Sequence, residues 1–230
     1  MMRCGVCGEV NDHLATKCVK CGGFLQAKVE TLDLFHTLWG LLESPARTFR
    51  TIALARRKNY SFVLAGVTGI GIVFFLFWLL NAGRHFNGIM ELLGIGLALG
   101  LPAGVLALGA LGVVHSLSAR LLGGRGGTRN AFALLAYACA PIVFSVVVVL
   151  PLEVAIFGIY FFDRNPHPLV INPVPYVALM GLDSVAIAWT LFLVWVGTRV
   201  SSGLHRWKSG FITLAVAVVA GGAVWLLRAL

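Results

Sequence analysis

The strongest constraint on the fold is a series of long apolar runs that carry almost no charge. Residues 61–80 read SFVLAGVTGIGIVFFLFWLL, and similar runs cover 89–118, 131–150, 175–197 and 210–227. A helix needs about 20 apolar residues to cross the hydrocarbon core of a bilayer. Charged residues make up 12% of the chain, whereas soluble domains carry about 25%. The pattern predicts an all-α integral membrane protein with five transmembrane helices in residues 61–230.

The third run is too long for a single crossing. It stays apolar from residue 131 to residue 162 and is interrupted only by Pro141, Pro151 and Glu153. As one helix it would measure about 48 Å, yet the part after Pro151 is too short for a second span. We therefore expect one crossing at 131–150, followed by an extension or interfacial piece at 152–162.

The basic residues predict the orientation. Nine Lys and Arg residues precede the first run, and three more lie in each of the loops around residues 120–129 and 199–208. The other side holds only Arg84, Arg164 and Arg228. Because Lys and Arg accumulate on the cytosolic side, we expect a cytosolic N-terminus and an external C-terminus. The net charge of +9 therefore indicates a lipid bilayer as the partner and not nucleic acid. The expected location is a prokaryotic inner membrane.

The first 25 residues form a separate cysteine-rich module. Cys4, Cys7, Cys18 and Cys21 make two C-x2-C pairs, each followed by glycine. Four thiolates at this spacing satisfy tetrahedral Zn²⁺ and leave no open position, so the metal is expected to be structural. Two disulfides or a rubredoxin-like iron site are the alternatives, and a reducing cytosol disfavours disulfides. Cys139 lies alone in the third run, where we expect ordinary packing.

Residues 26–60 connect this module to the first span and carry amphipathic helical patterns. The first pattern precedes Ser44-Pro45, which reads as the start of a second helix. Phe49 and Ile52 follow at helical spacing beside a basic flank. Such helices can lie at the cytosolic headgroup level; the alternative is packing on the cytosolic ends of the spans. The apolar residues of the first pattern are Leu34, Phe35, Leu38, Trp39, Leu41 and Leu42.

Small and acidic residues within the spans are the remaining candidates. Gly96, Gly100 and Gly104 form a doubled G-x3-G pattern that allows close helix packing, with homo-oligomer formation as a second interpretation. Asp183 lies inside the fourth run, and an intramembrane acid indicates a transport or ligand role by default. A structural hydrogen bond, or an ion pair with Arg84 or Arg164, is the alternative for Asp183.

No catalytic constellation is found in the sequence. His115 and Ser116 are adjacent near the inner end of the second run, but a serine hydrolase needs these groups oriented from different elements. GGRGG at 123–127 lacks the Gly-Lys-Ser/Thr ending of a nucleotide-binding loop. We therefore predict that the protein is not an enzyme.

Two parts of the chain resemble known families. CGVCGEVN and CVKCGGFL, with Asn11 and Leu25 in the matching places, are similar to the short zinc ribbons that head many prokaryotic membrane proteins. Residues 37–228 resemble the YIP family of Ypt/Rab-interacting membrane proteins, through a glycine-rich loop followed by L-x-Y-x-x-x-P and an upstream P-x-x-x-F-x-x-I. The residues that carry these two motifs are Leu135, Tyr137 and Pro141, and Pro45, Phe49 and Ile52.

The YIP resemblance implies five spans and a cytosolic N-terminus. Eukaryotic members are associated with Rab-type GTPases and early secretory traffic, but their D-L-Y-G-P stretch before the spans is absent here. The leading hypothesis is a membrane scaffold or adaptor whose zinc ribbon recruits an unknown protein partner. The alternative is a small transporter or channel with Asp183 lining the path.

Overall fold

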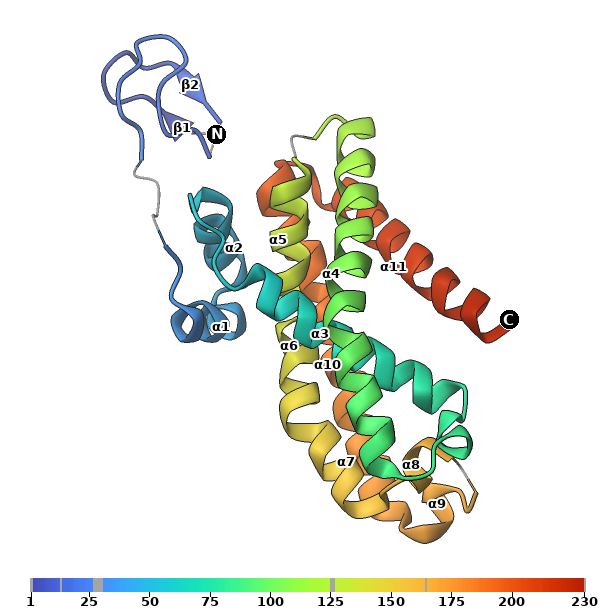
Figure 1. Ribbon diagram of the computed structural model, residues 1–230. Coiled ribbons are helices and arrows are strands. Elements are labelled where there is room, and N and C mark those ends of the chain that lie inside the picture. The colour runs from blue at the N-terminus through green and yellow to red at the C-terminus, as the bar shows by residue number, and fades with distance from the viewer. Residues whose placement is uncertain (1, 13, 27–30, 125–126, 164, 230) are drawn as a thin grey trace.

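The computed structural model describes residues 2–12, 14–26, 31–124, 127–163 and 165–229, except for the side chain of residue 229. A small cysteine-rich module is followed by a helical body (Figure 1). In chain order the elements are β1 (Met2–Arg3), β2 (Val10–Asn11), α1 (Leu34–Glu43), α2 (Pro45–Leu54), α3 (Ser61–Leu79), η1 (Ala82–His85), α4 (Ile89–Leu121), α5 (Thr128–Ala138), α6 (Ala140–Phe144), η2 (Ser145–Val149), α7 (Leu150–Phe157), α8 (Tyr160–Asp163), α9 (Pro168–Ile171), α10 (Pro173–Ser202) and α11 (Arg206–Ala229).

Five helical segments of the described chain are long and apolar enough to cross a membrane. They are α3, α4, the continuous segment Ala140–Phe157 formed by α6, η2 and α7, then α10, and residues Arg206–Arg228 of α11. The predicted class, an all-α protein with five membrane-spanning helices, is confirmed.

The third span lies further along the chain than predicted. The expected crossing at 131–150 is wrong, because the helix is interrupted at Cys139, whose ψ is 6°. Pro141 follows in the first turn of α6; in a continuous helix its ring would clash with the carbonyl of Tyr137. The span then runs from Ala140 to Phe157 and ends at Gly158, whose φ of 57° suits glycine.

The segment before that break, α5, is the centre of the larger hydrophobic core. Residues 133–138 are almost completely buried, packed among α2, α3, α4 and α10. The Tyr137 ring is fully buried and its hydroxyl group donates a hydrogen bond to the carbonyl of Asn59. Burial raises the pKa of Tyr137 to about 12. Residues 133–138, whose apolar character suggested contact with lipid, are thus in contact with protein.

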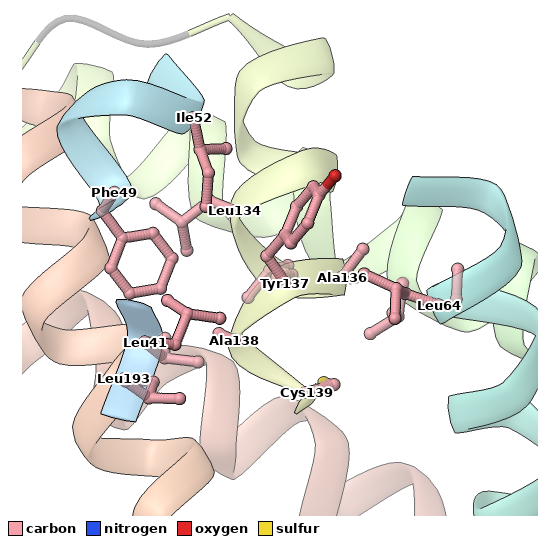
Figure 2. Packing of buried hydrophobic residues seen from close by; sticks show 14 of the residues in the cluster. Leu41, Phe49, Ile52, Leu64, Leu134, Ala136, Tyr137, Ala138, Cys139 and Leu193 are labelled. Carbon is pink, nitrogen blue, oxygen red and sulfur yellow. The ribbon is translucent and has the colours of Figure 1, made fainter. Parts of the chain in front are cut away.

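The second amphipathic helix, α2, also faces this core. Phe49 and Ile52 are each 2% exposed, and Figure 2 shows both side chains directed toward Leu134 of α5. For α2 the expected lipid contact of these two side chains is thus wrong, and packing on the ends of the spans is right. The predicted helix start at Pro45 is confirmed, although the Ser44 side chain makes no capping hydrogen bond.

The first amphipathic helix, α1, has one face on the core and one face outside. Asp33 caps its N-terminus, accepting a hydrogen bond from the backbone N–H of His36 at 2.7 Å. Leu41 is buried in the core, whereas the side chains of Phe35, Trp39 and Leu42 are largely exposed. These three residues recur at helical spacing and form one apolar face. In Figure 1, α1 lies crosswise to α4.

Two loops that were predicted to share a side of the membrane lie together. Lys208 donates a hydrogen bond from Nζ to the carbonyl of Leu122 at 3.1 Å, and Gly124 lies against the side chain of Leu204. At the opposite end, Gly83 of η1 packs on the backbone of Asp163. Loops separated by two spans lie on the same side, which explains this arrangement. Which end faces the cytosol stays a prediction.

The G-x3-G glycines mediate packing within the chain. Gly96, Gly100 and Gly104 are buried on α4, and a Cβ on Gly104 would lie only 2.0 Å from the carbonyl oxygen of Ala65 in α3. On Gly100 it would lie 2.5 Å from the Cα of Ile70. The interpretation as a helix-packing motif is confirmed. Because α3 covers this face, it is not available for the second interpretation, contact with another copy.

Candidate functional site

The four cysteines of the N-terminal module converge on one point. Their sulfur atoms lie within 4.8 Å of one another. The Sγ atoms of Cys4 and Cys21 are 3.6 Å apart, and those of Cys7 and Cys18 are 3.5 Å apart. A Zn–S bond of about 2.3 Å in a tetrahedral site places its sulfurs about 3.8 Å apart. Disulfide sulfurs lie about 2.05 Å apart, so the four sulfurs are not paired as disulfides and could together hold a metal ion.

Each C-x2-C pair folds as the same tight turn. Gly8 and Gly22 close the two turns, and their N–H groups donate to the carbonyls of Cys4 and Cys18 at 2.9 and 3.0 Å. Both glycines have positive φ, 72° and 71°, a conformation that favours glycine. The glycine after each C-x2-C pair therefore allows the chain to turn tightly around the four sulfurs.

Asn11 holds the two halves of the module together, a role that its place in the ribbon pattern did not reveal. Its Oδ1 accepts a hydrogen bond from the N–H of Val19 at 2.9 Å, and its Nδ2 donates to the carbonyl of Glu9 at 2.8 Å. The same amide nitrogen lies 3.5 Å from the sulfur of Cys18. A side chain with both a donor and an acceptor is needed for these contacts.

The backbone favours thiolates at two of the four sulfurs, those of Cys4 and Cys18, whereas the neighbouring cysteine side chains raise the pKa of Cys7. The N–H groups of Cys21 and Lys20 donate toward the Cys18 sulfur and lower its pKa to about 6. The N–H groups of Cys7 and Val6 likewise lower the pKa of Cys4. Since the thiolate is the ligand form of cysteine, the module is arranged to hold a metal ion. Its four ligands would close the coordination shell, which supplies structure and not catalysis.

The fifth cysteine is part of the core, as predicted. Cys139 is 6% exposed, at the end of α5 among the apolar residues drawn in Figure 2. It belongs to the hydrophobic cluster around α5 and not to the metal-binding group.

Asp183 makes a structural hydrogen bond, which was one of the alternatives for this residue. Its Oδ1 accepts a hydrogen bond from the hydroxyl of Ser145, and its carboxyl group interacts with that of Glu153. Arg84 lies elsewhere and donates to the carbonyl of Asn81 at 3.2 Å; Arg164 lies outside the described residues. Glu153, which the sequence placed near the end of a span, is 3% exposed. The structure thus brings two acids together within the spans.

His115 links two spans. Its Nε2 lies 2.9 Å from Oγ1 of Thr198, and that hydroxyl donates to the carbonyl of Val194 at 2.7 Å. The hydroxyl proton is therefore used, and Nε2–H of His115 is the donor between them. Both side chains are buried. The contact joins α4 to α10 and gives His115 a packing role.

Comparison with protein families finds a match over most of the chain. The family model described as the Yip1 domain matches residues 39–228. Neither the curated proteins nor the solved structures contain a match to this chain. The matched region begins within α1 and includes every membrane-spanning helix, whereas the cysteine module lies before it. Since the match covers more than half of the chain, this protein belongs to the Yip1 domain family.

Proposed function

We propose that this protein is a non-enzymatic multi-pass membrane adaptor. In this proposal, the N-terminal ribbon binds one Zn²⁺ and recruits a cytosolic or membrane protein partner to the Yip1 domain. The cysteine cluster is the observation that carries the proposal, because four converging sulfurs close the coordination shell and leave no position for a substrate. The cluster also precedes the region that the family shares, as expected for an added recruitment module.

The surface of the ribbon supports contact with a protein. Val6 and Val19 each lie between the two cysteines of a C-x2-C turn. Both side chains are largely exposed, as is that of Phe24. A module of this size buries little apolar surface, yet it displays these three side chains to solvent. Burial of exposed apolar side chains is a common source of affinity at protein interfaces.

A lipid contact completes the proposal. The exposed face of α1, made by Phe35, Trp39 and Leu42, suits insertion at the headgroup level of a bilayer. Exposed arginines at 47, 50, 56 and 57 would pair with anionic lipids. The protein would then lie in a cell membrane, such as a prokaryotic inner membrane, with the N-terminus in the cytosol and the C-terminus outside.

The test is proximity labelling of the full chain in cells, with elemental analysis of the purified protein. Cys18→Ser should lose the metal and the labelled partners but should still fractionate with membranes, because the spans pack without the ribbon. A triple variant with Val6, Val19 and Phe24 replaced by Ser should keep stoichiometric zinc and lose the partners. Unchanged labelling in the triple variant would overturn the proposed recruitment surface, and bound iron would replace zinc in the proposal.

A second candidate function is a small transporter or channel. The observation that favours it is the pairing of Asp183 with Glu153 in the interior of the spans, because acids at this depth often mark ion or substrate pathways. Flux of a cation into proteoliposomes that disappears in Asp183→Asn would place this candidate first. Proteoliposomes without such flux would leave the adaptor as the function.

A further inference from the structure

The membrane-spanning helices surround a cavity of about 340 Å³. Its wall comes from α3, the segment from α6 to α7, α8 and α10, with one residue of α11. The volume is within the range of small-molecule sites, about 300–1,000 Å³. Most of the lining is aliphatic or aromatic. Among the described residues that line it there are two acids, Glu153 and Asp183, and no Lys, Arg or His.

Among the described residues that line the cavity, none offers the acidic pair a positive charge. Ser145 donates to Asp183, but Oε1 of Glu153 is buried and has no hydrogen-bond partner in the described structure. The Glu153 side chain is 3% exposed and lines the cavity. A buried acceptor without a donor is costly, and a buried carboxyl group beside a second, partly buried one is costly unless a proton or a cation lies between them. A ligand that donates a hydrogen bond to Oε1 of Glu153 would therefore be stabilised in this cavity.

Aromatic rings line the same cavity as the two carboxyl groups. Phe74, Phe75, Trp78 and Phe161 all line the cavity, and the rings of Phe75 and Trp78 are stacked with centroids 5.7 Å apart. The face of an aromatic ring attracts an organic cation, and this attraction is larger where water is excluded. A neutral ligand would leave the carboxyl groups unpaired, and a hydrated metal ion would gain nothing from the apolar wall.

The cavity is reached from the flank of the helices. Phe75 and Ile187 belong to its wall, and their side chains are 44% and 48% exposed on the outer surface of α3 and α10. In a membrane this surface faces lipid, because both residues lie within spans. A ligand that enters by this route must dissolve in the bilayer while carrying a positive group.

We propose that this cavity binds a lipophilic organic ammonium ion, with its nitrogen between Glu153 and Asp183 and its apolar body against the aromatic rings. The ammonium N–H groups donate to the unpaired oxygen of Glu153 and to Asp183, while Ser145 orients the Asp183 carboxyl group. The site goes beyond the adaptor function, and it requires no transport, since binding and flux are measured separately.

The probe for the test is monodansylcadaverine, a fluorescent primary amine with an apolar body. The full-length protein is reconstituted in nanodiscs of phosphatidylcholine, and fluorescence anisotropy is measured as protein concentration rises. N-butyl dansylamide, which has a similar body and no amine, is the matched ligand. We expect saturable binding of the amine, weaker by about tenfold to a hundredfold in Glu153→Gln and in Asp183→Asn, the range for losing a charge-assisted hydrogen bond.

Glu91→Gln is the matched protein control. Glu91 is an acid at the start of α4 that accepts hydrogen bonds from Asn87 at 2.9 and 3.0 Å and does not line the cavity. This variant should bind the amine as the unaltered protein does. The comparison of the two ligands on the unaltered protein needs no variant to fold. Equal affinity for the amine and its neutral analogue, or equal loss in Glu91→Gln, would overturn the proposal.

Discussion

The contact between α3 and α4 leads to a sharp stability prediction at Gly104. In Gly104→Ala the new Cβ would lie 2.0 Å from the carbonyl oxygen of Ala65 and 2.6 Å from the Cα of Gly69. Ordinary contacts begin at 3.4 Å, so the two helices must separate locally by about 1.4 Å. The atoms in the way are backbone atoms, which cannot rotate aside as a flexible side chain can.

The expected cost follows from two opposing terms. Overpacking costs about 1–3 kcal/mol, and replacing a helical glycine with alanine returns up to about 1 kcal/mol. Because the clash is between backbones, we expect a net loss of about 2 kcal/mol. In a domain of this size that loss lowers Tm by about 4–8 °C.

Gly109→Ala is the matched control, because it makes the same chemical change in the same helix. Its Cβ would meet nothing within 4 Å, so only the gain in helix propensity should remain and Tm should stay or rise slightly. The measurement is thermal unfolding by circular dichroism in one detergent, with the molecular mass from light scattering. If both variants shift Tm equally, the close packing of α3 on α4 is refuted.

Four further predictions concern the cytosolic side and the topology. Phe49→Ala should destabilise the protein by about 3–5 kcal/mol, the cost of removing a buried aromatic side chain, and denaturant unfolding in micelles would measure it. A photo-crosslinking residue at position 35 or 42 should form lipid adducts detectable by mass spectrometry, and one at the buried position 52 should not. Burial, and secondarily Arg129, lower the pKa of Lys58 from 10.5 to about 8. The unfolded chain therefore holds an extra proton between these values, and stability should rise with pH across this window; Lys58→Met should remove that rise in pH-dependent melting curves. Alkaline phosphatase fused after Asn165 should be active and after His205 inactive; activity after His205 would contradict the predicted orientation.

The cysteine module was predictable because its information is local. Its ligands lie within 18 residues, and two glycines with positive φ follow the ligand pairs directly. Spacing alone therefore specifies which atoms can meet around a metal ion. Only the role of Asn11, which bonds to the backbone of the other half, required the folded module.

The number of spans was predictable for a similar reason, but the neighbours of each apolar residue were not. Hydrophobicity records that a side chain avoids water, and it does not distinguish lipid from protein. Residues 131–138 begin an apolar run that is long enough for a span, yet they form most of the buried core helix α5. Phe49 and Phe35 are equally apolar in the sequence, although one is buried in the core and the other is exposed.

The chain by itself determined the class of the protein, its five apolar helices and its four candidate metal ligands, because each depends on composition or short spacing. The tertiary structure alone decided which helix faces pack against each other. It placed the glycines of α4 against α3, and it brought Glu153 beside Asp183, which are 30 positions apart in the sequence. Contacts between helices depend on rotation and tilt, which are set by the packing of all neighbours at once. No local pattern records these quantities.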